Sequence, residues 1–105
     1  MVAGTSLAPE LHNGDAYDFK VDTWSYGVIL YKLLTGKSHC PALEGVSDRK
    51  AIVKIYKEYK PDVQPLLLRQ VSAQAMDLVQ KCLVVDPGRR ITMSAALKHG
   101  WFKTI

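Results

Sequence analysis

The residue types that most often carry chemistry are thinly spread in this 105-residue sequence. His39 and Cys40 are adjacent, whereas metal sites normally use ligands that are spaced along the chain. His12 and His99 have no serine or cysteine arranged with them as a nucleophile and its base. None of the seven glycines forms a G-x-G, so no phosphate-binding loop is indicated. We therefore predict no catalytic, cofactor-binding or metal-binding residue within this chain.

Four lysines form the most regular charged pattern. Lys50, Lys54, Lys57 and Lys60 recur at helical spacing, and the net charge of the chain is +4. The other basic residues are spread along the sequence, and a lysine stripe is usually the solvated face of a helix. We expect no specific nucleic-acid partner, although a small nucleic-acid binder stays open as an alternative.

The composition is that of a globular domain, with 48% hydrophobic and 23% charged residues. The longest apolar run, residues 28–34, contains Lys32 and is shorter than the roughly 20 residues that a membrane span needs. Cys40 and Cys82 lack a CxxC spacing and read as reduced thiols. We expect a cytoplasmic or nuclear protein with no membrane partner.

Apolar periodicity predicts an all-α fold of four helical segments. Residues 21–35 are apolar around nearly the whole helix and stop at Gly36, which is typical of a buried central helix. The other segments begin at a capping residue: Ser47, Ser72, and Thr92 or Ser94. Three short helices cannot enclose the central one, so we expect exposed apolar surface and self-association through it.

Four motifs follow one another along the chain. They are A-P-E at 8–10, D-T-W-S-Y-G-V-I-L-Y at 22–31, L-V-V-D-P with R-I-T across 83–92, and A-L-K-H-G-W-F at 96–102. Together they closely resemble the second half of the catalytic domain of serine/threonine protein kinases. Within that family, the sequence is most similar to the calcium/calmodulin-dependent group, including checkpoint kinases. The resemblance implies a partial C-terminal lobe with four helices around a buried central helix.

The resemblance also implies roles for individual residues. Glu10 would form a buried ion pair with Arg90, and a carboxylate and a guanidinium fit such a two-bonded pair well. Asp22 and Trp24 would support the catalytic loop, with Asp22 hydrogen-bonded to the backbone of that loop. These are structural roles.

Residues Thr5, Ser6 and Leu7 correspond to a possible substrate-docking loop. Between Gly4-Thr5 and Ala8 the family normally has two more residues, including an aromatic one, so this loop departs from the pattern. Gly100 also stands where proline is common before the tryptophan.

The resemblance assigns residues 1–105 to one partial kinase domain, from the end of the activation segment through the final helix. The N-terminal lobe, catalytic loop and metal-binding motif of the family do not occur in this sequence. Complete kinases use ATP and magnesium, whereas we expect this chain alone to be catalytically inactive. Its partners would be a protein substrate or the remaining kinase portion.

One further alternative is a free-standing interaction module derived from a kinase lobe. In that hypothesis the central helix and a face made by Ile52, Tyr56 and Tyr59 would bind a protein partner.

Overall fold

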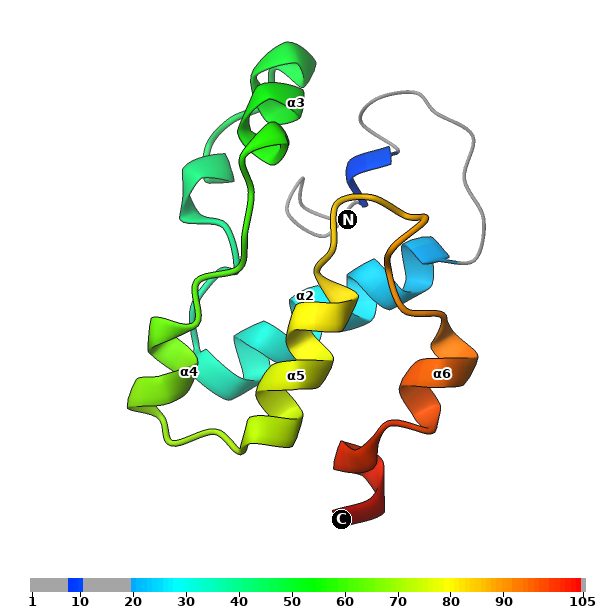
Figure 1. The fold of residues 1–105 in the computed structure, drawn as a ribbon. Coiled ribbons are helices and arrows are strands. Elements are labelled where there is room, and N and C mark those ends of the chain that lie inside the picture. Colours follow the sequence, from blue (N-terminus) through cyan, green and yellow to red (C-terminus); the bar gives the residue numbers. More distant parts are fainter. Residues whose placement is uncertain (1–7, 11–19, 105) are drawn as a thin grey trace.

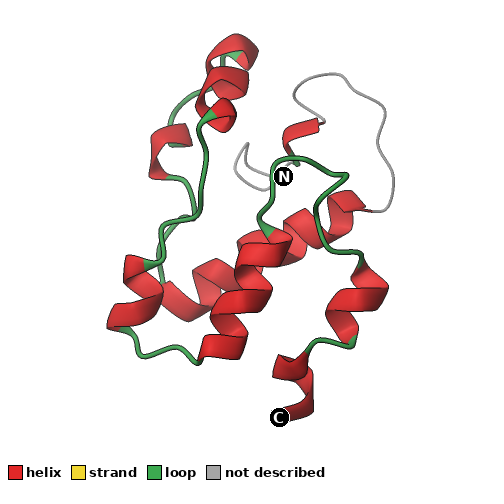
Figure 2. Cartoon of the chain, viewed as in Figure 1, coloured by secondary structure: helices red, strands yellow, loops and turns green. Residues whose placement is uncertain are grey.

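The computed structural model describes residues 8–10 and 20–104 (Figure 1). Its helices are α2 (Lys20–Thr35), α3 (Arg49–Lys57), α4 (Gln64–Leu68), α5 (Ala73–Cys82) and α6 (Met93–Leu97), with two short 3₁₀ turns, η2 (Pro41–Leu43) and η3 (Gly100–Thr104). Figure 2 shows no strand in the described residues. The all-α prediction is confirmed.

Helix α2 is the central element, and it contacts α4, α5 and α6. It lies close to the end of α5 at Gly27, where an added Cβ would be 2.7 Å from Cys82 Cβ and 3.0 Å from Leu83 Cδ2. Side chains never pack that closely, so only glycine allows the two helices this contact. Trp24 and Tyr31 are buried on the same side of α2.

The helix starts follow the capping chemistry of the sequence. Ser72 Oγ accepts a hydrogen bond from Ala75 N, and Thr92 Oγ1 accepts one from Ala95 N. The cap of α3 is Asp48, whose Oδ2 accepts from Ala51 N, so the prediction of Ser47 was wrong by one residue. A carboxylate at this position also interacts favourably with the positive end of the helix dipole.

Helix α4 was not predicted, because its five residues are too few for a periodic pattern and its N-cap residue, Val63, has no side chain that could cap the helix. Leu66 is fully buried, whereas Leu67 and Leu68 are exposed. The preceding connection is fixed to the central helix, since the Tyr31 hydroxyl donates to the Asp62 carbonyl oxygen at 2.7 Å.

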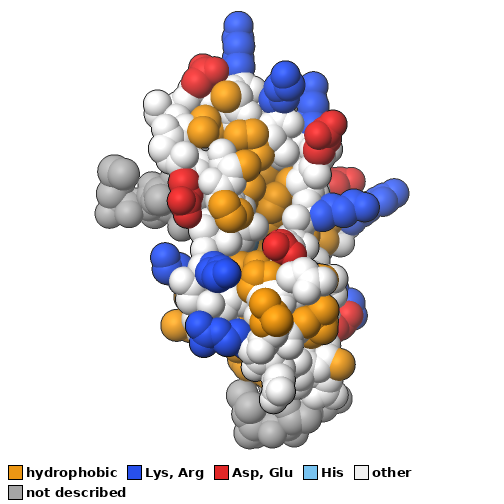
Figure 3. All heavy atoms as spheres, turned by 90° about the vertical axis from the view of Figure 1, so that its left-hand side faces the viewer, with side chains coloured by type: hydrophobic (Ala, Val, Ile, Leu, Met, Phe, Trp, Pro, Cys, Tyr) orange, Lys and Arg blue, Asp and Glu red, His pale blue; other side chains and the backbone are white. Residues whose placement is uncertain are grey.

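One side of α2 carries little cover. Asp22, Ile29 and Leu33 share a face by their helical spacing, opposite Trp24, and all three are exposed, Leu33 by 78%. Hydrophobic side chains also reach the surface on the side of the molecule where α3 and α4 lie, with lysines and arginines around them (Figure 3).

Among the described residues, no helix has the length and apolar character to cross a membrane.

Candidate functional site

A tight turn after α5 positions Arg90. Asp86 Oδ1 accepts a hydrogen bond from Gly88 N at 2.9 Å, and the Asp86 carbonyl accepts from Arg90 N at 3.1 Å. Ile91 N then donates to the Lys81 carbonyl oxygen, which returns the chain to the end of α5. Aspartate followed by proline and glycine favours such a turn, because the carboxylate caps free backbone N–H groups. The Arg90 side chain is thereby directed into the interior.

Arg90 and Glu10 form a buried, two-bonded ion pair. Nη1 donates to Glu10 Oε2 and Nη2 donates to Glu10 Oε1, both at 2.8 Å. The other donations of the guanidinium go to backbone carbonyl oxygens: Nε to Val84, Nη1 to Lys20 and Nη2 to Val85. All five N–H groups of the arginine thus have an acceptor.

This pairing matters because both side chains are almost completely buried, Arg90 at 2% exposure and Glu10 at 3%. A buried charge is tolerated only where its partner and hydrogen bonds replace the lost water. The two residues are separated by 80 positions in the sequence. The pair therefore joins the segment at 8–10 to the turn before α6.

Trp24 lies against the other side of this pair. The guanidinium carbon of Arg90 is 5.1 Å from the centroid of the Trp24 ring, within cation–π range. His39 and Tyr56 meet the indole edge-on, each with ring centroids 5.5 Å away, and Tyr59 is tilted against it at 5.7 Å. We call Glu10, Arg90, Trp24 and these three rings the Arg90 cluster.

The polar atoms of His39, Tyr59 and Trp24 lie inside the Arg90 cluster and serve its packing. His39 Nδ1 and the Tyr59 hydroxyl are hydrogen-bonded at 2.7 Å. Burial raises the pKa of Tyr59 far above its ordinary value, so this phenol stays protonated at neutral pH. Trp24 Nε1 is buried and has no hydrogen-bond partner in the described part of the chain. From the sequence His39 was considered only as a metal ligand beside Cys40, and no local pattern shows that it is buried beside Trp24.

The structure separates the predicted site residues into two places. Glu10, Arg90 and Trp24 lie together in the Arg90 cluster, whereas Asp22 is exposed in the first turn of α2. The prediction for residues 5–7 concerns positions outside the described residues.

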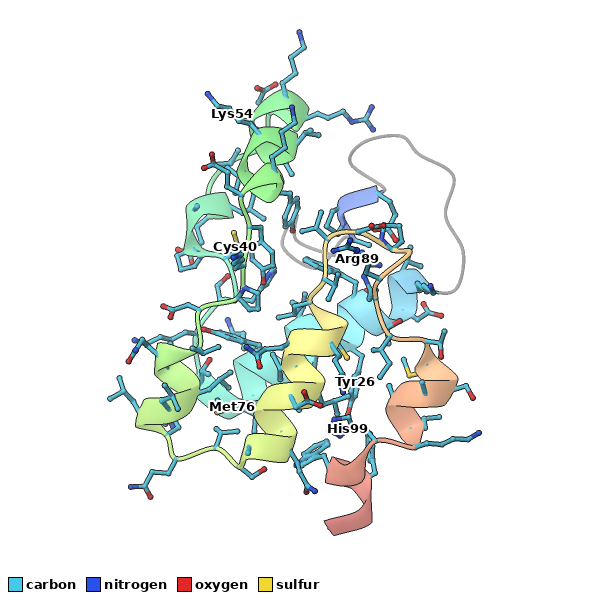
Figure 4. All side chains as sticks on the ribbon, viewed as in Figure 1. Tyr26, Cys40, Lys54, Met76, Arg89 and His99 are labelled. Carbon is cyan, nitrogen blue, oxygen red and sulfur yellow. The ribbon has the colours of Figure 1, made fainter. Side chains whose placement is uncertain are left out.

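A second polar group ties η3 to α5. His99, labelled in Figure 4, places Nε2 2.7 Å from Asp77 Oδ2. The same Asp77 oxygen pairs with Lys81 Nζ at 2.8 Å. Trp101 N donates to His99 Nδ1, so in the neutral ring Nε2 carries the proton that Asp77 accepts. Hydrogen bonds from Lys81 and then His99 hold the pKa of Asp77 below its ordinary value. Because both ring nitrogens of His99 are occupied, this group fixes structure and offers no free base.

The described residues contain no group of three or more His, Cys, Asp or Glu side chains that could hold a metal ion. What the Arg90 cluster does offer is a rigid joint between distant segments, since its ion pair is closed to solvent and its donors are used.

Comparison with known proteins gives consistent matches. A family model described as "Protein kinase domain" matches residues 2–102. Calcium-dependent protein kinase 3 of Plasmodium berghei is 41% identical over 96% of this chain and 18% of its own length. Serine/threonine-protein kinase cds1 of Schizosaccharomyces pombe is 39% identical over 94% of the chain and 22% of its own length.

Among solved structures, the Rad53 kinase domain with SCD2, in complex with AMPPNP, superposes with a TM-score of 0.75. It is 31% identical, and the alignment covers 94% of this chain and 38% of that one. The chain thus spans about a fifth of the length of the curated relatives it matches.

Proposed function

Since this chain belongs to the protein kinase domain family, we propose that it forms the carboxyl-terminal part of a serine/threonine kinase catalytic domain. Residues 1–105 would run from the end of the activation segment through the final helix. Phosphoryl transfer from ATP to serine or threonine of a protein substrate would then be the activity of a longer polypeptide that includes this part.

The observation that carries this proposal is the buried Glu10–Arg90 pair. The A-P-E motif at 8–10 is held on the turn before α6, with Trp24 of the central helix packed on the guanidinium. Such a joint suits a segment that has to keep a fixed shape while substrate binds nearby. In this proposal residues 5–7 contribute to substrate docking.

The exposed face of α2 supports the same proposal. Ile29 and Leu33 would pack against the catalytic-loop portion of the lobe, and the Asp22 carboxylate would accept hydrogen bonds from its backbone. Ile29 is 57% exposed and Leu33 is 78% exposed. Covering both residues would remove from water apolar surface that the described residues leave exposed.

The residues present do not fit ATP or magnesium. The sequence has no G-x-G, and the described part of the chain offers no set of carboxylates that could hold the ion. Phosphoryl transfer depends on positioning and on charge around the transferred group. The chain alone is therefore expected to transfer no phosphate.

The test is transfer of radiolabelled γ-phosphate by the 105-residue chain, beside a polypeptide that adds the kinase portion preceding it. We expect label in protein only with the longer polypeptide. Transfer by the 105-residue chain, abolished by a substitution within it, would contradict the proposal.

A second candidate is a free-standing interaction module, which the exposed Ile29 and Leu33 favour. The face first assigned to it needs correction, because Ile52 and Tyr56 are buried in the structure. To separate the candidates, the chain is mixed with the separately produced preceding kinase portion, with Leu33→Glu as the disrupting variant. Association that Leu33→Glu abolishes supports the lobe assignment, and no association favours the module.

A cytoplasmic or nuclear location is part of the proposal. Cys40 and Cys82 are buried free thiols, which suits a reducing compartment. Burial raises the pKa of Cys82 to about 11, so this thiol should resist alkylation until the protein unfolds. Thiol titration of the native and the denatured protein measures this directly.

A further inference from the structure

A groove of about 630 Å³ lies between the α3–α4 connection and the α5–α6 connection. Pro61 and Val63 line it from the first connection, and Val84 and Val85 from the second. Val85 also borders a smaller depression of about 110 Å³, which continues the groove toward Pro9. Two rings of the Arg90 cluster border this surface, Tyr59 in the larger part and Tyr56 in the smaller depression, and the Arg90 guanidinium bonds to the carbonyl oxygens of Val84 and Val85 in one wall.

Cations stand along the groove. Lys60 and Arg89 line the larger part, and Lys57 lines the smaller depression. All three side chains are exposed, and none has an ion-pair partner within the described residues. The acidic residue of the larger part is Asp86, whose Oδ1 already accepts a hydrogen bond from Gly88 N. Positive charge therefore exceeds negative charge around an apolar floor.

We propose that this groove binds a protein segment in which an apolar side chain is flanked by acidic residues. The apolar side chain would lie on Val63 and Val84, and the flanking carboxylates would pair with Lys60 and Arg89. Neither cation gives up an existing ion pair to do so. Figure 4 shows Arg89 on the connection after α5, away from α3, from which Lys54 projects.

Nucleic acid fits the groove less well. Binding of single strands relies on exposed aromatic rings on which bases stack. Tyr59 lines the larger part of the groove, but its ring is only partly exposed and is packed against Trp24 and Tyr56. Tyr56 itself is 3% exposed, and most of the other apolar lining residues are valine and proline. Such a floor suits an aliphatic or aromatic side chain of a peptide.

The test uses the full chain and a fluorescein-labelled peptide with a Phe-Leu pair flanked by glutamates on both sides, followed by fluorescence anisotropy. Charge reversal at each cation, Lys60→Glu or Arg89→Glu, should weaken binding about threefold, and the double variant about tenfold. Lys37→Glu is the matched control, because Lys37 is exposed and outside the groove, and its affinity should equal that of the unchanged chain.

Two altered probes make the test independent of how the variants fold. A peptide with glutamines in place of the glutamates tests the charges, and one with a Gly-Gly pair in place of Phe-Leu tests the apolar floor. Both should bind several-fold more weakly. The proposal is overturned if the unchanged chain does not bind the acidic peptide, or if the double variant binds it equally well. Tighter binding of a labelled single-stranded oligonucleotide would overturn it in favour of nucleic acid.

Discussion

The two sides of helix α2 differ in burial: one is covered by other residues and the other is exposed. On one side Trp24 is fully buried among the other residues of the Arg90 cluster. Every N–H of the Arg90 guanidinium there has an acceptor. On the other side Ile29 and Leu33 stand in solvent beside Asp22. A helix that is apolar all round is suited to being covered all round.

The enclosed Arg90 cluster and the exposed face of α2 have different roles in this account. In the Arg90 cluster, the ion pair joins residues 80 positions apart, and every N–H of its guanidinium has an acceptor. The exposed face of α2 is a surface that a further part of the lobe would cover, as proposed above. Substitutions on the two sides should therefore differ greatly in their effect on stability.

Arg90→Met should have the largest effect. It strands the buried Glu10 carboxylate and removes every hydrogen bond of the guanidinium, so the free energy of unfolding should fall by about 3–5 kcal/mol. Urea unfolding followed by circular dichroism measures the loss. The exposed neighbour provides the control, because Arg89→Met should change stability by less than about 0.5 kcal/mol. Equal losses for the two variants would contradict the burial of the Arg90 ion pair.

Gly27→Ala should have the next largest effect. In an open helix this change would stabilise by about 1 kcal/mol. Here the new methyl group would meet Cys82 Cβ at 2.7 Å, and forcing α2 and α5 apart should cost about 1–3 kcal/mol. Lys32→Ala, at an exposed position of the same helix, controls for helix propensity. A rise in melting temperature for Gly27→Ala would show that the close contact is absent.

Leu33→Glu should leave stability within about 0.5 kcal/mol, because its side chain is already in solvent. Fluorescence of a hydrophobic dye and any self-association should both decrease. The matched change Leu30→Glu buries a charge on the covered side and should unfold the protein. Dye binding that Leu33→Glu leaves unchanged would show that this face is not the exposed apolar surface.

The smallest expected effect is a loss of stability at acidic pH. The pKa of Asp77 is lowered in the folded protein, so its ion pair contributes stability at neutral pH that is lost as the pH falls below about 4. Because the Asp77 side chain is 49% exposed, the contribution should be only a few tenths of a kcal/mol. Urea unfolding at pH 6 and at pH 3 should show less acid sensitivity in Asp77→Asn. An unchanged pH dependence would mean that the pair contributes nothing.

The sequence allowed helices to be predicted where a capping residue precedes apolar residues at helical spacing, as at Ser72 before α5 and at Thr92 before the short α6. Helix α4 is as short as α6 but has no capping side chain at Val63, so neither a period nor a cap marks it, and it is held by burial of Leu66. The pairing of Glu10 with Arg90 came from the resemblance to kinases. Nothing in local periodicity links residues so far apart.

The burial of His39 was equally inaccessible. A histidine beside a cysteine and a proline looks like an ordinary loop residue, and its place against Trp24 depends on how the loop after α2 folds back. The groove near Lys60 and Arg89 likewise needs two connections that are distant in sequence.

The measurement that most directly tests the structural joint is a double-mutant cycle of Glu10→Leu and Arg90→Met, read from urea unfolding. If the pair is buried and closed as described, each single variant strands a charge, and the double variant should be less destabilised than the sum of the two. We predict a coupling energy of at least about 2 kcal/mol. Effects that add within about 0.5 kcal/mol would contradict it, because residues without direct interaction behave additively.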